Sequence, residues 1–332
     1  MRVALALGSG GARGYAHIGV IHELLERGHD IVGVAGSSMG ALVGGLHAAG
    51  KLDEYTLWAS SLTQRTVIRL LDPSLGAAGV LRAGKILDAV RDILGDVTIE
   101  ELPIPYTAVC TDLIAGKSVW LQHGAVDEAI RASIAIPGVI SPHVHDGRLL
   151  ADGGILNPIP MAPIAAVNAD MTIAVGLSGD DPESRRTARE RPTAEWLKGK
   201  WRSTSSLLES KAARSLLETT TGRAVLGRFS TVDDDGPEAS EDADLPESAE
   251  PAVPRLGGFE VMNRTIDIAQ SALARHTLAA YPPDLYIEVP RTVCRSLDFH
   301  RADEVIGIGQ ALAAAALDTV APRPEADPDS AG

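Results

Sequence analysis

Ser38 lies at the centre of residues 36–40 (GSSMG), the pattern G-x-S-x-G in which a serine becomes a nucleophile. Gly36 and Gly40, two residues to either side, allow a sharp turn from a strand into a helix, because larger side chains would collide there. Such a turn projects the serine hydroxyl above the edge of a sheet. The chemistry expected of this serine is acyl transfer.

A second chemical feature is the glycine-rich loop 8–14 (GSGGARG), which follows an apolar run predicting a buried strand over 2–7. Helical spacing of apolar residues then predicts a helix that ends near Gly28. Amides at a helix N-terminus can bind a phosphate or the oxyanion of an acyl-transfer intermediate. The dinucleotide-binding fingerprint G-x-G-x-x-G would need glycine where this chain has Arg13. A second strand, predicted over 31–35, ends in the serine turn, so both loops should meet at the carboxyl edge of the sheet.

The third feature is Asp152, which precedes Gly153 and Gly154 and follows a predicted hairpin over 144–150 (VHDGRLL) with an Asp-Gly turn. Taken alone, Asp-Gly-Gly is more often a solvated turn than a catalytic site. Its position after the other two features in the chain changes this interpretation.

Serine turn, glycine loop and Asp-Gly-Gly, in this arrangement, resemble the patatin-like phospholipase family. Residues 132–138 (ASIAIPG) and the pair Asn157-Pro158 also resemble family segments. The resemblance covers residues 1–178, with weaker support from 284–318. It implies an α/β fold of three layers, α/β/α, with a mainly parallel central sheet and a nucleophile elbow at Ser38.

The resemblance also implies a catalytic dyad, with Ser38 as nucleophile and Asp152 as general base. The amides of Gly10, Gly11 and Ala12 would form the oxyanion hole. Other motif residues would support the site: Gly8, Arg13, Gly14, Gly36, Gly40, Gly153 and Gly154. Arg13 would hold the loop or meet a lipid phosphate, and the structural role is favoured. The implied substrate is a phospholipid or lysophospholipid acyl ester, and the implied reaction needs no cofactor.

Alternatives remain open at this point. A triad would need a histidine late in the chain, and the candidates are His276, in a predicted helix over 263–280, and His300. A transacylase, a serine peptidase, and a lipid-binding or regulatory protein with a weak site are further possibilities. The nine histidines show no pairing with metal-ligand spacing, which predicts no catalytic metal.

Length and composition limit the possible classes of protein. A chain of 332 residues with 45% hydrophobic content favours one α/β domain, placed at 1–320. Two cysteines give no disulfide framework, and no apolar run reaches the roughly 18 residues of a spanning helix. The short apolar stretch before the glycine loop does not predict a signal peptide. We therefore expect a cytoplasmic protein, at most attached peripherally to the inner membrane face.

Charge is unevenly distributed. Residues 233–250 hold nine acidic residues and no basic ones, which predicts a disordered acidic insertion over about 231–256, and a disordered tail is predicted over 321–332. A variable basic and helical segment is expected over about 180–230. Within it, residues 185–202 carry seven Lys or Arg with interleaved tryptophans, which could contact an anionic membrane face peripherally, although a solvated connection is favoured. A sequence pI near 5.1 argues against nucleic-acid binding.

The remaining pattern predicts helices across 51–103, with apolar residues that could line an acyl pocket. Further strands are expected over 106–110, 118–121, 172–177 and 285–289, and a helix over 126–132.

Overall fold

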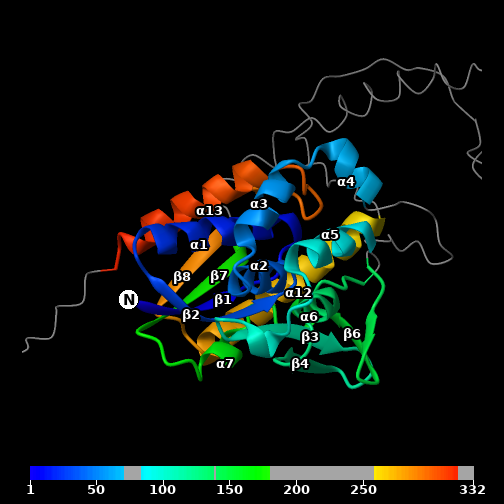
Figure 1. Ribbon diagram of the computed structural model, residues 1–332, viewed down its shortest axis with the longest axis horizontal. Helices are drawn as coiled ribbons and strands as arrows, with labels where there is room; N and C mark the ends of the chain where they lie inside the picture. The colour runs from blue at the N-terminus through cyan, green and yellow to red at the C-terminus, as the bar shows by residue number, and fades with distance from the viewer. Residues whose placement is uncertain (71–83, 138–139, 180–257, 321–332) are drawn as a thin grey trace, which may run out of the picture. The chain divides into compact units, whose positions relative to one another are not determined.

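The computed structural model describes residues 1–70, 84–137, 140–179 and 258–320, and its centre is an eight-stranded sheet (Figure 1). The strand order is β5-β6-β3-β2-β1-β7-β8, and β4 also pairs with β3. The strands are β1 (Arg2–Leu7), β2 (Asp30–Ser37), β3 (Tyr106–Asp112), β4 (Lys117–Leu121), β5 (His143–His145), β6 (Arg148–Asp152), β7 (Met171–Gly179) and β8 (Leu285–Pro290). Strands β3, β2, β1, β7 and β8 run parallel, whereas β4, β6 and β5 pair antiparallel. The predicted mainly parallel α/β fold is confirmed.

Central strand β1 is apolar along almost its whole length because both faces of the sheet are covered. Alternate side chains enter different cores: Val3, Leu5 and Leu7 contribute to one, and Ala4 and Ala6 to the other. Helices on both faces give the three predicted layers (Figure 1).

The larger core is covered by α1 (Ala16–Glu26), α2 (Met39–Ala48), α6 (Val126–Ser133) and α13 (Ala302–Leu317). The smaller core, rich in alanine, lies under α7 (Met161–Ile164) and α12 (Gly258–Ala280). Helix α13 packs against α1 so closely that a Cβ on Gly19 would lie 2.0 Å from the carbonyl oxygen of Ile306. This contact brings the C-terminal helix next to the helix that follows the glycine loop.

The helical stretch predicted over 51–103 contains α3 (Leu52–Ser60), α4 (Gln64–Leu70), α5 (Gly84–Leu94) and a short 3-10 turn, η2 (Ile99–Glu101). The helical stretch is interrupted between α3 and α4, near Thr63. The side chain of Thr63 accepts a hydrogen bond from the amide of Thr66 at 3.2 Å. Two more 3-10 turns, η1 (Gly11–Tyr15) and η3 (Gly153–Ile155), occupy the glycine loop and the Asp-Gly-Gly segment.

The predictions for 180–230, 231–256 and 321–332 concern segments outside the described residues. Within the described ranges, no helix is both long and apolar enough to span a membrane.

Candidate active site

Ser38 occupies the turn between the end of β2 and the start of α2. Its backbone has φ 56° and ψ −123°, and only 2% of the residue is exposed. The flanking glycines are required by packing: a Cβ on Gly36 would lie 2.2 Å from the carbonyl oxygen of Gly40, and one on Gly40 would lie 2.1 Å from that of Leu7. The residue therefore has the geometry of a serine on a strand-to-helix elbow.

Sheet register brings Asp152 to this serine across one intervening strand. Ser37 pairs with Val109 on β3, and the next β3 residue, Cys110, pairs with Asp152 on β6. The Ser38 hydroxyl donates to Oδ2 of Asp152 at 2.5 Å, and the contact is buried. The other carboxylate oxygen accepts from the amide of Gly154 at 2.7 Å. The Asp-Gly-Gly segment is thus a buried site, not a solvated turn.

The electrostatics of Asp152 follow from its surroundings. Burial raises the pKa of its carboxyl group from 3.8 to about 6, and the hydrogen bonds from Ser38 and Gly154 act in the opposite direction. At neutral pH the group is still mostly ionised, but it is a stronger base than a free aspartate. The carboxylate is therefore suited to accept a proton from the serine hydroxyl.

The glycine loop lies beside the elbow, since β1 and β2 are parallel neighbours and Leu7 pairs with Gly36. Within the described residues, the amides of Gly10 and Gly11 have no hydrogen-bond acceptor, and Gly11 lines the same pocket as Ser38. The amide of Ala12 already donates to the carbonyl of Ser296 at 2.9 Å. Two of the three amides expected in the oxyanion hole are therefore free to serve, and the third is occupied.

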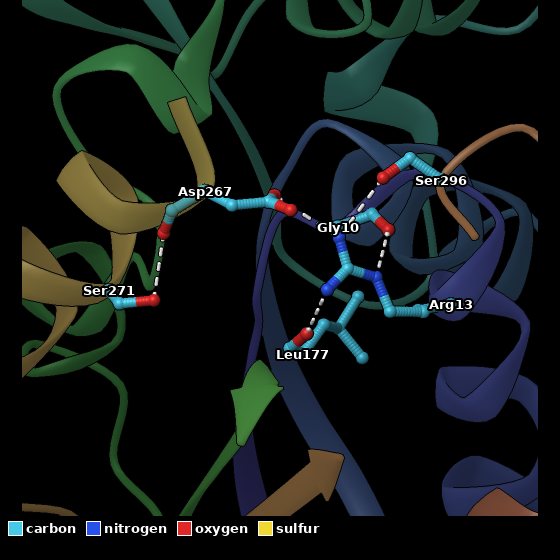
Figure 2. A network of polar contacts seen from close by, with 6 residues as sticks. All are labelled: Gly10, Arg13, Leu177, Asp267, Ser271 and Ser296. Atoms are coloured by element: carbon cyan, nitrogen blue, oxygen red, sulfur yellow. Dashed lines mark hydrogen bonds and ion pairs between the residues drawn. The ribbon is translucent and has the colours of Figure 1, made fainter. Parts of the chain in front are cut away.

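Arg13 is buried beneath the loop in a network of polar contacts, which we call the Arg13 cluster (Figure 2). Its Nε donates to the carbonyl of Gly10 at 3.1 Å and its Nη1 to that of Leu177 at 3.0 Å. Nη2 reaches Oδ1 of Asp267 at 3.2 Å and Oγ of Ser296 at 3.1 Å. Since these contacts surround the guanidinium and leave the residue 3% exposed, they favour holding the loop over binding a lipid phosphate.

Two further side chains hold the backbone of the site. His17 is fully buried with Nε2 2.8 Å from the carbonyl oxygen of Gly8, and burial lowers its pKa to about 4. The ring is therefore neutral, with its Nε2–H donating to that carbonyl. Ser133, at the end of α6, accepts from the amide of Ser38 at 3.0 Å and donates to the carbonyl of Val109 at 2.6 Å. Ser133 thus links the amide of Ser38 to the backbone of Val109 in β3.

The other motif glycines are close-packed as well. A Cβ would meet a neighbouring atom at under 3.0 Å at Gly8, Gly14, Gly153 and Gly154.

The histidines proposed for a triad do not join this site. His276 is exposed on α12, and His300 lies in the loop before α13. Among the described residues, no histidine forms a hydrogen bond with Ser38 or Asp152. The geometry therefore favours a dyad.

An apolar pocket opens beside Ser38, with an empty volume of about 730 Å³ that includes space open to solvent. Some of the apolar residues in the predicted helical stretch do line it, while Leu57 and Ile68 are exposed. The lining residues are Gly11, Tyr15, Ser38, Met39, Leu42, Tyr55, Trp58, Leu62, Val67, Leu70, Ile86, Ile134, Ile136, Ile140, Leu297 and Phe299.

The chain is similar in sequence to known proteins. Residues 5–165 match the family described as patatin-like phospholipase. An uncharacterized NTE family protein of Mycobacterium tuberculosis is 68% identical over 329 residues, which cover 96% of this chain and 91% of that protein. The chain belongs to the patatin-like phospholipase family. The resemblance noted from its motifs is confirmed, and membership of this family indicates a lipid acyl hydrolase.

Other relatives match only part of this chain. Patatin-like phospholipase domain-containing protein 6 of Mus musculus is 31% identical over 202 residues, covering 59% of this chain and 15% of that protein. Among solved structures, VipD from Legionella pneumophila aligns with a TM-score of 0.42 at 15% identity, covering 96% of this chain and 66% of that one.

Proposed function

We propose that the chain hydrolyses acyl esters of phospholipids or lysophospholipids through a dyad of Ser38 and Asp152. The observation that carries this proposal is the 2.5 Å contact between the serine hydroxyl and the buried carboxylate, at the wall of an apolar pocket. The reaction needs neither a metal ion nor an organic cofactor, because the carboxylate supplies the base.

In the acylation step, Oγ of Ser38 attacks the ester carbonyl carbon while its proton passes to Asp152. The carbonyl oxygen becomes an oxyanion, which accepts hydrogen bonds from the amides of Gly10 and Gly11. Losing one such donor typically lowers turnover about a hundredfold to a thousandfold. When the intermediate collapses, the ester C–O bond breaks and Asp152 returns the proton to the departing alcohol.

In the deacylation step, a water molecule attacks the acyl carbon and gives a proton to Asp152. Collapse releases the fatty acid, and the proton returns to Oγ of Ser38. An alcohol in place of water would accept the acyl group by the same route, so transacylation uses the same residues.

The pocket supports a lipid substrate over a peptide. Apolar and aromatic side chains form most of its wall, and they would bury a hydrocarbon chain favourably, by roughly 0.8 kcal/mol per methylene group. A peptide backbone would leave unpaired polar groups in such a pocket, at a cost of about 1–3 kcal/mol each.

Labelling by a fluorophosphonate, read by mass spectrometry, tests the nucleophile. We expect the probe on Ser38 in the wild type, and no labelling at that position in Ser38→Ala. Hydrolysis of long-chain esters should be lost in Ser38→Ala and Asp152→Asn and retained in His276→Ala and His300→Ala. Short acyl esters and a peptide amide, assayed beside the long-chain ester, define the substrate class.

Three results would overturn the proposal. Loss of activity in a folded histidine variant would replace the dyad with a triad. Preference for the peptide amide would indicate a peptidase. If the folded wild type neither labels nor hydrolyses any ester, a lipid-binding or regulatory role becomes the better account.

A further inference from the structure

A carboxylate and two imidazoles converge on one face of β5, away from the dyad. Glu128 comes from α6, and His143 and His145 come from β5, where residues two apart point to the same face. One potential ligand atom from each of the three lies within 4.8 Å of those of the other two. We propose that Glu128, His143 and His145 form a binding site for a divalent transition-metal ion, with zinc as its best-fitting occupant.

The three side chains of this cluster lie close together. Nε2 of His143 lies 2.7 Å from Oε2 of Glu128, the distance of a histidine–carboxylate ion pair. The rings of His143 and His145 are 6.0 Å apart, centroid to centroid, and tilted by 34°. A modest rotation of side chains would direct all three ligand atoms at one point.

Burial and position allow an ion to enter. The side chains of His143, His145 and Glu128 are 12%, 24% and 29% exposed, so they are sheltered but still reachable from solvent. Val144, between the two histidines, faces the other way and is 68% exposed. The alternation of the strand thus separates the ligand face from the opposite face.

The donor set selects the metal. Two imidazoles and one carboxylate suit zinc and its transition-metal neighbours, and three protein ligands leave a fourth position for water. Calcium and magnesium prefer oxygen ligands throughout, so both should bind this set poorly.

Neighbouring charges act on the site in different ways. Nη2 of Arg91 donates to Oε1 of Glu128 at 3.0 Å, which fixes the carboxylate and leaves Oε2 toward the histidines. Such contacts from outside the ligand set commonly orient a metal ligand. Arg91 and the nearby Arg131 also add positive charge, which limits the affinity for a cation.

The site would cross-link two elements that support the dyad. Helix α6 ends at Ser133, which accepts the hydrogen bond from the amide of Ser38, and β5 pairs with β6, which ends at Asp152. An ion here would stabilise the fold without contacting the acyl group. The expectation from histidine spacing concerned a catalytic metal, and a site whose third ligand comes from another element gives no signal in that spacing.

Zinc titration of the full-length chain, after removal of metals with EDTA, tests the site. Competition with a zinc-binding dye should show one zinc per chain, with a dissociation constant in the micromolar range or below. His143→Gln, His145→Gln and Glu128→Gln should each weaken binding at least tenfold. Zinc should raise the melting temperature of the wild type and not that of these variants, while excess magnesium or calcium should not displace it.

His123→Gln is the matched control. His123 is 83% exposed beside Glu100 at 3.5 Å, so it offers a surface histidine–carboxylate pair without a second histidine. The affinity of the His123→Gln variant for zinc should equal that of the wild type. The proposal fails if the wild type binds zinc only above about 100 µM, or if all variants bind equally, which would mean an adventitious ion only. Circular dichroism of the metal-free variants verifies that each is folded.

Discussion

In the part of the chain that the structure describes, two turns place a non-glycine residue at positive φ, and they do so for different reasons. Ser38, with φ 56°, is 2% exposed at the elbow between β2 and α2. Asp146, with φ 48°, lies at the tip of the β5–β6 hairpin, where its side chain is 88% exposed. No other non-glycine residue in the described ranges has such a backbone.

At the hairpin tip, the positive φ follows from the local sequence alone. Asp-Gly is favoured in a two-residue hairpin because aspartate tolerates the left-handed conformation and the following glycine adopts it freely. At the elbow, a ψ of −123° takes Ser38 outside the left-handed helical region, and such backbone costs on the order of 1–3 kcal/mol. Packing around Gly36 and Gly40, together with the bond from Ser38 to Ser133, maintains it. Strain is retained where surrounding structure fixes the chain.

Substituting alanine for one glycine in each turn should give the largest difference in unfolding free energy between the two regions. In Gly36→Ala the new Cβ would meet the backbone of Gly40 and Ala41 at 2.2–2.4 Å, so we expect a loss of more than about 4 kcal/mol in unfolding free energy. In Gly147→Ala nothing lies within 4 Å of the new Cβ, and the φ of 73° should cost about 1 kcal/mol. Urea denaturation measures both. Equal losses would mean that the elbow is not held by packing.

Replacing Asp152, which contacts Ser38, and Asp146, at the hairpin tip, should also have different effects on stability. Asp152→Asn removes a buried charge whose pKa is raised to about 6, so above that pH the variant should gain about 2–3 kcal/mol of unfolding free energy while losing ester hydrolysis. As the pH falls from 6 to below 4, the carboxyl becomes neutral in both folded and unfolded states, and the gain should vanish. Asp146→Asn should change stability by less than about 0.5 kcal/mol. A destabilised Asp152→Asn at pH 8 would contradict the argument.

The pH dependence of ester hydrolysis should also distinguish Asp152 from Asp146. If Asp152 is the base, kcat/KM for an ester should fall about tenfold per pH unit below about 6, because protonation removes the proton acceptor. Asp146→Asn should show the same acidic limb as the wild type. A limb near 4 in the wild type would mean that burial does not perturb the base.

Two substitutions of Ser38 should report the backbone strain at the elbow, and they have the smallest expected effect. Ser38→Gly and Ser38→Ala both lose the hydroxyl and its bond to Asp152, so their difference reports on the backbone. Glycine relieves the strained conformation but loses more chain entropy on folding, and we expect Ser38→Gly to be the more stable by about 1 kcal/mol. Thermal unfolding of the two proteins gives this difference. A more stable alanine variant would show that the elbow is unstrained.

Much of the fold was predictable because its signals are local. The central strands appear as apolar runs since both faces are buried, and the hairpin is marked by Asp146-Gly147. Element ends were less certain: the strand predicted over 31–35 extends over Asp30–Ser37, and that over 172–177 extends over Met171–Gly179.

The contacts of the candidate site were less predictable, because polar partners from distant segments have no local signal. Ser133 lies 95 positions from Ser38, although it falls within the family-like block 132–138. Asp267 and Ser296 lie 254 and 283 positions from Arg13. The carbonyl of Ser296 also occupies the amide of Ala12, which spacing alone could not reveal.

The Arg13 cluster has a consequence for the order of synthesis. Chain growth delivers Ser38 and Asp152 well before Asp267, Ser296 and the carbonyl of Phe299, which accepts from the hydroxyl of Tyr15. A nascent chain that already contains Ser38 and Asp152 therefore lacks these contacts, which hold the glycine loop 8–14. We therefore expect the proposed esterase activity to arise only when the last part of the fold has left the ribosome.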